Sequence, residues 1–291
     1  MEKGIKKVSG RMVYIFLIIL LISGYSNAQD EVRLIIRGDD MGMTQGSLIA
    51  FEKAFNEGVL TCASIQVPAP WFEGAAELCR KNPGWCTGVH LTLVGEWRGY
   101  PWRPVLPWDK VSSLVDEDGY FYRYPKELHA HKPKLEEIEA ELRAQIELAK
   151  KKGISVQYLD VHYGSTNGYP GANEIVEKIA RDYDLPISGS IDEKNLTIYT
   201  VPAASKKDSA VIMLEKIEPG LYLWVCHPGI DSPEQHALIH TSAEDIMIEG
   251  GNVGLHRAMI TNTLTSVELQ SVILKRDIIL TNYKELWEKR K

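Results

Sequence analysis

Cysteine is scarce in this chain of 291 residues, and the spacing of the cysteines excludes small metal modules. The 4 cysteines are Cys62, Cys79, Cys86 and Cys226, and none of them belongs to a CxxC pair. A zinc ribbon is therefore excluded. Cys79 and Cys86 could form a disulfide in an oxidising compartment, but four packed thiols are the slightly favoured interpretation for a domain of this size.

Basic runs, internal repeats and low-complexity segments are also lacking. The 33 Lys and Arg are outnumbered by 39 Asp and Glu, which gives a net charge of -6. An acidic chain without a basic run is not expected to bind nucleic acid. A composition of 44% hydrophobic and 25% charged residues excludes a disordered, collagen-like or coiled-coil chain. A mean hydropathy of -0.18 excludes a polytopic membrane protein.

A long apolar run lies near the N-terminus, and its flanks are those of a secretory signal. Met12 to Ile22 is apolar throughout, and Ser26-Asn27-Ala28 provides small residues for a signal peptidase. The preceding segment is made positive by Lys3, Lys6, Lys7 and Arg11. An uncleaved anchor is the less favoured alternative, because a membrane span needs roughly 20 apolar residues. We predict a signal peptide over residues 1–28 and a single periplasmic or secreted domain over residues 29–291, with no membrane span in the mature chain.

Apolar periodicity indicates that strands and helices alternate from residue 32 onward. Helices are expected where apolar residues recur at helical spacing, over residues 44–58, 73–81, 133–153 and 173–183, with another opened by a capping box at Thr265 and Glu268. Short β-rich runs predict strands over residues 32–36, 59–67, 87–93, 157–162, 185–190, 221–226 and 277–280. This alternation predicts an α/β fold, a single irregular TIM-like barrel of about seven strands.

Residues 95–133 interrupt the alternation with a long aromatic segment that includes Trp97 and Trp102. Long loops inside compact domains are usually functional. Aromatic faces suit the apolar C–H faces of sugar rings. A small hydrophobic cluster under the loop is an equally weighted interpretation.

Polar side chains gather at the predicted carboxyl ends of the strands, where barrel enzymes carry their active residues. They are Asp39, Asp40, His90, Asp160, His162 and His227. Each one alone has an ordinary alternative, such as a helix cap for the Asp pair, a buried hydrogen-bonded imidazole for His90 or a turn residue for His227. Asp160 and His162 share one strand face, so the carboxylate could orient the imidazole. The remaining histidines are interpreted as surface groups: His129, His131, His236, His240 and His256.

One Asp and two His side chains supply the donor set that suits Zn²⁺ or a similar divalent ion with open positions. An adjacent carboxylate could accept a proton from the attacking water, and a further His could protonate a departing amine. The cluster therefore indicates hydrolysis of an amide or an ester.

At these residues the chain resembles the YdjC-like carbohydrate deacetylases. The resemblance runs over residues 32–287 and is carried by RGDDMGMTQG at 37–46, FNEGVLTCASIQVPAPWF at 55–72, TGVHLTL at 87–93, ELRAQIELAKKKGISVQYLDVHYG at 141–164 and CHPG at 226–229. It implies an irregular barrel related to polysaccharide deacetylases. It also implies metal-dependent removal of N-acetyl groups from amino sugars.

The resemblance also implies roles for individual residues. Asp40, His90 and His162 match the ligands of one divalent ion, Mg²⁺ or Zn²⁺. Asp39 matches the catalytic base, and His227 is the expected acid. Where family members often continue the DxH segment with further histidines, this chain has Tyr163-Gly164-Ser165. We predict that Asp160 orients an imidazole and that substrate contacts come from Trp97, Trp102 and Tyr163.

Other functions remain open at this stage. The same scaffold could hydrolyse an O-acetyl ester or a phosphoester, since fold does not determine chemistry. A secreted sugar-binding protein without catalysis is a second alternative, and a structural envelope protein a weaker third. The sequence leaves open the length and source of the acetylated sugar and the oligomeric state, a homodimer included.

Overall fold

The computed structural model describes residues 31–242 and 251–290. The predicted signal peptide, residues 1–28, lies outside the described residues. None of the helices within the described ranges combines the length and the apolar character that crossing a bilayer requires.

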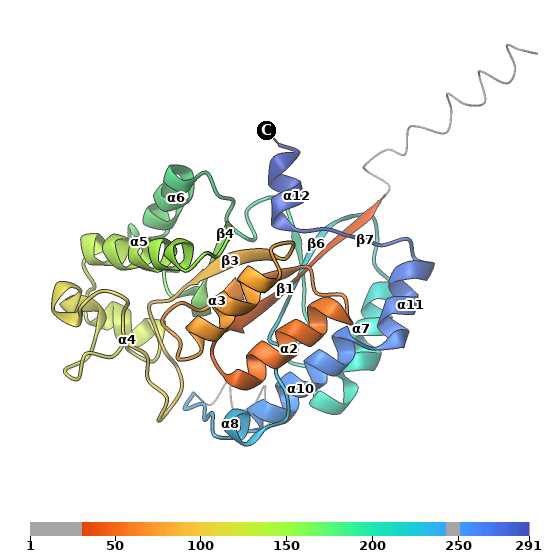
Figure 1. Ribbon diagram of the computed structural model, residues 1–291, viewed down its shortest axis with the longest axis horizontal. Helices are drawn as coiled ribbons and strands as arrows, with labels where there is room; N and C mark the ends of the chain where they lie inside the picture. The colour runs from red at the N-terminus through yellow and green to blue at the C-terminus, as the bar shows by residue number, and fades with distance from the viewer. Residues whose placement is uncertain (1–30, 243–250, 291) are drawn as a thin grey trace, which may run out of the picture.

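One parallel sheet organises the molecule (Figure 1). Its strands are β1 (Val32–Met41), β2 (Cys62–Ile65), β3 (Cys86–Leu91), β4 (Val156–Val161), β5 (Lys194–Leu196), β6 (Gly220–Cys226) and β7 (Ile279–Leu280). The strand order is β4-β3-β2-β1-β6-β5, and β7 pairs with the first half of β1. Among the described residues no strand pairing joins β4 to β5, so the barrel is open along this edge. The α/β prediction with seven strands is confirmed.

Helices flank the sheet at its centre and toward both of its edges (Figure 1). Near the centre α2 packs on β1 and α3 packs on α2, α5 and α6 lie together at one side, and α7, α10 and α11 lie together at the other. The helices are α2 (Gln45–Asn56), α3 (Phe72–Lys81), α4 (Pro125–Ala130), α5 (Leu135–Lys151), α6 (Ala172–Tyr183), α7 (Lys206–Glu215), α8 (Pro233–His236), α10 (Val253–Leu264), α11 (Val267–Lys275) and α12 (Tyr283–Glu288). Single 3-10 turns occur at η1 (Trp108–Lys110), η2 (Ser112–Leu114), η3 (His162–Gly164) and η4 (Ala203–Ser205).

Local sequence signals predicted most of these elements. Thr44 caps α2 by accepting a hydrogen bond from the Ser47 backbone N–H, and the Ser47 side chain bonds back to complete a capping box. The late helix, however, is capped by Ser266 and not by Thr265, whose hydroxyl donates to the Thr261 carbonyl. Residues 185–190 were expected to form a strand. They make a single parallel bridge, Ile187 to Leu159, and the next strand is β5.

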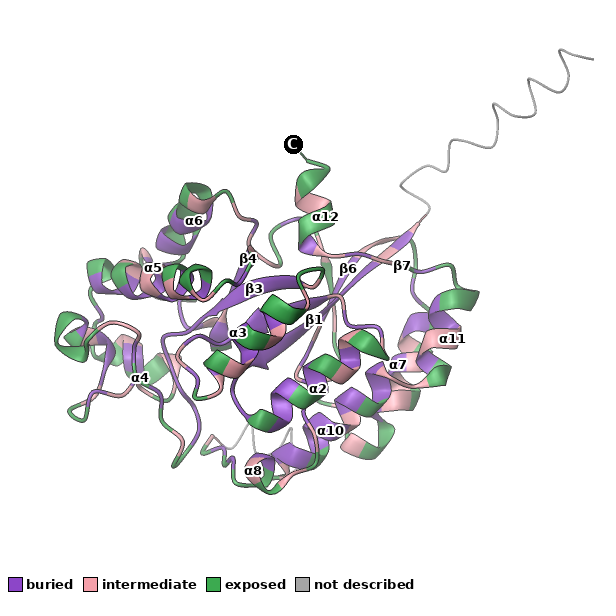
Figure 2. Ribbon diagram, in the orientation of Figure 1, coloured by how far each residue is buried: buried purple, intermediate pink, exposed green. Residues whose placement is uncertain are grey.

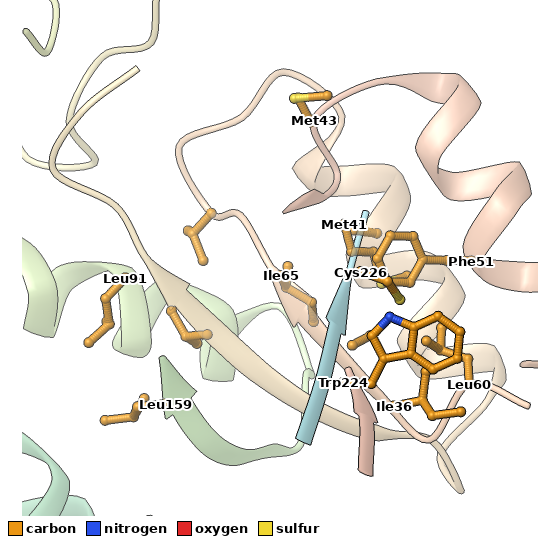
Figure 3. Close-up of a cluster of buried hydrophobic side chains, with 14 of the residues drawn as sticks. Ile36, Met41, Met43, Phe51, Leu60, Ile65, Leu91, Leu159, Trp224 and Cys226 are labelled. Atoms are coloured by element: carbon orange, nitrogen blue, oxygen red, sulfur yellow. The ribbon is translucent and has the colours of Figure 1, made fainter. Parts of the chain in front are cut away.

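The core has an outer and an inner part. On the outer face of the sheet, Ile36 and Trp224 pack with Phe51 of α2 and with Leu60 (Figure 3). β1, β2 and β3 are buried almost throughout, whereas β5 and β7 carry exposed residues, and the helices expose their outward sides (Figure 2). The inner face of the sheet carries a second cluster: Ile35, Cys62, Cys86, Tyr158, Ile191, Leu223 and Tyr283. Because the faces of the sheet are covered, the carboxyl ends of its strands are the place where a functional site is expected.

All 4 cysteines are buried and none forms a disulfide. The favoured interpretation of packed thiols is therefore confirmed, and Cys79 and Cys86 are not joined. Cys86 instead lies in register with Cys62 on the neighbouring strand.

Candidate metal and active site

The end of β1 brings two adjacent carboxylates to the same place. Neighbouring side chains of a regular strand point to opposite faces. The pairing of β1 with β2 shifts between Gly38 and Met41, and Asp40 adopts a positive φ of 67°. This bulge turns the Asp40 side chain back toward the side used by Asp39. Both carboxylates consequently lie close to His90. Asp39, His90 and Asp160 form one group of potential metal ligands, and Asp40, His90 and His162 form another.

Asp40, His90 and His162 form a triangle of potential ligand atoms. Asp40 Oδ1 lies 3.5 Å from His90 Nε2 and 3.6 Å from His162 Nδ1, and the two imidazole nitrogens are 3.1 Å apart. Ligands bound to one ion at about 2.1 Å are separated from one another by roughly 3.0–3.4 Å. The three atoms therefore have the spacing of a metal centre, and the sequence predicted all three residues.

The two oxygens of Asp40 have different environments. Oδ2 accepts a hydrogen bond of 2.8 Å from Arg257 Nη1. Oδ1 is buried and has no hydrogen-bond partner among the described residues. Burial by itself would raise the pKa of Asp40, but the Arg257 guanidinium and the nearby His90 imidazole hold it well below its usual value. A buried anionic oxygen without a donor is costly, and a cation beside it removes that cost.

Asp160 orients His90 rather than His162. Its Oδ2 lies 2.6 Å from His90 Nδ1, because these residues are register partners on β4 and β3. Burial by itself would lower the pKa of His90, but the charges of Asp160 and Asp39 raise it well above its usual value. The contact leaves Nε2 to face Asp40, as in metal sites where a carboxylate holds the far nitrogen of a ligating histidine.

Glu96 provides the matching contact for His162, and it was not among the predicted site residues. Its Oε2 lies 2.9 Å from His162 Nε2, and its side chain is 3% exposed. Glu96 follows the strand β3 by a few residues and belongs to no motif. One signal could have indicated it. Glu96 comes shortly after a strand end, as the predicted polar site residues do.

Arg37 holds the predicted base. Its Nε and Nη2 groups donate to Oδ1 and Oδ2 of Asp39, each at 2.7 Å, and Nη2 also lies 3.2 Å from Asp160 Oδ2. Burial opposes the charge of Arg37, yet the carboxylates of Asp160 and Asp39 raise its pKa well above the usual value. Arg37 and Asp39 share the inner face of β1 because they are two residues apart. The bidentate pair fixes the orientation of the Asp39 carboxylate.

A cavity of about 460 Å³ lies over these groups. Its wall includes His227, which is half-buried at the end of β6, together with Tyr199 and Arg257. Arg257 comes from α10, far along the chain, and no local motif indicated it. His240 also lines the cavity and is 7% exposed, while His256 is 2% exposed. The interpretation of these two histidines as surface groups was wrong, because long-range packing covers them.

The residues predicted to contact the sugar differ in how exposed their side chains are. Tyr163 lines the cavity and is 40% exposed. Trp97 and Trp102 are each 1% exposed, and the Trp97 ring packs on His240 at a centroid distance of 4.1 Å. Their rings therefore contact protein atoms in this structure. Substrate binding by Trp97 and Trp102 stays a prediction that their burial does not support.

Fold and cluster together define an α/β protein with a candidate divalent-metal centre at the carboxyl ends of its strands. The chain belongs to the YdjC-like protein family, whose model matches residues 33–275. The sequence resemblance is thereby confirmed.

Named relatives match along most of their length. A carbohydrate deacetylase of Enterococcus faecalis is 31% identical over 267 residues, covering 87% of this chain and 98% of the relative. A carbohydrate deacetylase of Brevibacillus brevis is 27% identical over 262 residues, covering 88% of this chain and all of the relative. A crystal structure from Enterococcus faecalis, described as a cellobiose-phosphate cleavage protein, has a TM-score of 0.70 and 27% identity, covering 88% of this chain and 99% of that one.

Proposed function

We propose that this protein is a metal-dependent deacetylase that removes N-acetyl groups from amino sugars or their oligomers and releases acetate. The observation that carries the proposal is the convergence of Asp40, His90 and His162, with the buried Oδ1 of Asp40 lacking a donor among the described residues. The names of the family relatives support the choice of substrate class.

The residues present fit one divalent cation. Asp40 Oδ1, His90 Nε2 and His162 Nδ1 would hold it, with positions left for solvent and substrate. An O, N, N donor set suits Zn²⁺ better than Mg²⁺, which prefers oxygen ligands. Such a cation lowers the pKa of water and polarises a carbonyl group. Asp160 and Glu96 keep the two imidazoles in the orientation that binding requires.

The protein's own groups supply the proton transfers. Asp39, oriented by Arg37, accepts a proton from the water that attacks the acetamide carbon. His227, which lines the same cavity, donates a proton to the amide nitrogen as the C–N bond breaks. An amine leaves only when its nitrogen is protonated. The products are acetate and a free amino sugar.

The test combines metal analysis with acetate release from a panel of N-acetylated and O-acetylated sugars. We expect acetate from N-acetyl substrates, activity that is lost on chelation and restored by a divalent ion, and loss of bound metal in His90→Ala and His162→Ala. Phosphate release from a sugar phosphate without acetate release would instead favour the phosphoester alternative, which the name of the similar crystal structure brings into consideration.

The location of this activity is part of the proposal. The charged, apolar and small-residue segments of residues 1–28 support export and cleavage near Ala28. N-terminal sequencing of the protein recovered from a secreting host tests this. A mature chain that still begins at residue 1 would contradict it.

A further inference from the structure

Arg37, which orients the proposed catalytic base, has a third partner that the proposed chemistry does not use. Its Nη1 donates a hydrogen bond of 2.5 Å to Oγ of Ser188, while Nε and Nη2 donate to Asp39. A guanidinium has no acceptor, so Ser188 Oγ accepts this bond and keeps its own proton for another partner. The Arg37 side chain is therefore also held through the nitrogen that Asp39 does not contact.

Ser188 in turn contacts Tyr283, the first residue of α12. Ser188 Oγ lies 2.5 Å from Tyr283 Oη. A serine hydroxyl can accept a hydrogen bond from Arg37 and donate one to Tyr283 at the same time. The Tyr283 side chain is fully buried, and its ring packs on Tyr158 at a centroid distance of 4.7 Å. The C-terminal helix α12 thus anchors the hydroxyl that Ser188 contacts.

The backbone around Ser188 is fixed as well. The Ser188 N–H donates to the Leu159 carbonyl of β4 at 2.8 Å, and the Leu159 N–H donates to the Pro186 carbonyl at 3.0 Å. On the other side of Ser188, Glu193 Oε1 accepts a hydrogen bond of 3.0 Å from the Gly189 N–H. Because its backbone is tied at both sides, Ser188 presents its hydroxyl at a fixed place and does not follow movements of Arg37.

The Tyr283 hydroxyl acts as a neutral group. Burial raises the pKa of Tyr283 well above its usual value, and the negative charge of Glu193 adds to this effect. A neutral phenol adds no charge beside Arg37, which already has the carboxylates of Asp39 and Asp160 as partners. The contacts of Ser188 and Tyr283 therefore act on the orientation of the guanidinium and leave its charge balance unchanged.

The orientation of Arg37 matters because Asp39 follows it. Two parallel hydrogen bonds join the guanidinium to both carboxylate oxygens, so the two groups move as a unit. A general base acts only when its oxygen lies within hydrogen-bond reach of the proton that it removes. We propose that Ser188 and Tyr283 are positioning residues that hold the Arg37–Asp39 pair in the geometry for proton transfer. This inference rests on the proposed function.

The test uses Ser188→Ala and Tyr283→Phe, each of which removes one hydroxyl. We expect kcat for acetate release to fall about 5–50-fold, because a displaced catalytic group is costly even when the substitution is distant. KM and metal content should stay near those of the unmutated protein, since neither residue lines the cavity over the candidate metal centre or belongs to its ligand triangle.

Two further variants separate the hydroxyl contacts from a general loosening of the fold. Ser188→Thr keeps the hydroxyl, and its added methyl group has room because Ser188 lines a second cavity of about 920 Å³, so kcat should be largely retained. Tyr169→Phe is the matched control. It removes a hydroxyl that donates to the Pro133 carbonyl at 2.8 Å instead of to Ser188, and kcat should not change.

The double variant of Ser188→Ala and Tyr283→Phe tests whether Tyr283 acts through Ser188. If it does, the double variant has the kcat of Ser188→Ala alone, whereas independent effects would multiply. The Arg37–Asp39 pair is also followed without turnover, by NMR of the Arg37 Nε–H. Its exchange with solvent should be several-fold faster in Ser188→Ala and Tyr283→Phe than in the unmutated chain and in Tyr169→Phe.

Unchanged kcat in both single variants, a loss of kcat in Ser188→Thr equal to that in Ser188→Ala, or multiplying effects in the double variant overturns the inference. So does Arg37 exchange that none of the substitutions alters. Failure of the proposed function has a different signature, namely no acetate release by the unmutated chain from any acetylated sugar. The exchange of the Arg37 Nε–H is measured independently of that result.

Discussion

Two histidines face the candidate metal position through different nitrogens, because each is held by its own carboxylate. Asp160 contacts Nδ1 of His90 and leaves Nε2 facing Asp40, whereas Glu96 contacts Nε2 of His162 and leaves Nδ1 facing Asp40. Such contacts fix the ring orientation and raise the basicity of the ligating nitrogen. The site therefore depends on residues that would not themselves touch the cation.

Replacing Glu96 by Gln should weaken metal binding by about 10–100-fold, because the negative charge beside His162 is lost while the side-chain shape is kept. Competition with a chromophoric chelator measures this affinity directly. Glu117→Gln, an exposed position in the same long loop, is the control and should bind metal normally. Equal affinities for the two variants would show that Glu96 does not position the imidazole.

Asp39→Asn should lower kcat by about 10²–10⁴-fold while metal content stays near that of the unmutated protein. Asp39 is bonded to Arg37 and lies outside the Asp40, His90 and His162 triangle, so its charge serves proton transfer. Acetate release and elemental analysis on the same preparation provide the measurement. Metal loss in this variant would mean that the roles of Asp39 and Asp40 are exchanged.

At the scale of elements, β1 decides how the site is assembled. Its alternating residues place Arg37 and Asp39 inward, and its bulge adds Asp40 to the same side. The helix that follows packs closely behind this segment: a Cβ on Gly38 would lie 2.6 Å from Phe51 Cε1 and 2.9 Å from Phe51 Cζ. Glycine at this position is required by the approach of α2 to β1.

Gly38→Ala should consequently destabilise the fold by about 1–3 kcal/mol through overpacking. Urea denaturation gives the free energy of unfolding. Gly84→Ala is the matched control, since a Cβ there meets nothing within 4 Å, and it should change stability by no more than about 0.5 kcal/mol. A Gly38→Ala variant as stable as the control would mean that Phe51 moves aside without cost.

At the scale of the whole molecule, the candidate centre exists only in the folded chain. Its groups come from β1, β3, the turn after β4 and α10, which converge at one end of the sheet. A cation that binds the native state alone stabilises it, by about 2.7 kcal/mol at a concentration of 100 times Kd. Chelation should therefore lower the melting temperature of the unmutated protein, and His162→Ala should lose this response.

Metal affinity should also rise with pH. In the protein without cation, burial by itself would lower the pKa of His90, but Asp160 and Asp39 raise it above its usual value, so a proton competes with the cation for this histidine. As pH increases through that raised pKa, the proton is released and the affinity increases; as pH falls, it decreases. Chelator competition between about pH 6 and pH 8 measures the slope. A flat profile would contradict protonation of His90 in the metal-free state.

Much of this protein was determined by the sequence alone. The alternation of apolar runs determined the α/β class, the Thr44 cap determined the start of α2, and polar residues at strand ends indicated Asp40, His90 and His162. These are local signals: periodicity, capping and position along a strand depend on neighbours in the chain. The first half of the fold, where strands and helices follow one another closely, was predicted best.

The tertiary structure alone decided the rest. Arg257 reaches Asp40, Glu96 reaches His162, and Asp160 reaches His90 across strands, contacts that join residues far apart in sequence. The bulge that redirects Asp40 depends on pairing with β2. The burial of His240 and His256 involves Trp97 and Tyr199, which pack against them from distant parts of the chain. No local pattern encodes such contacts, because they arise from the relative placement of elements that only the folded core determines.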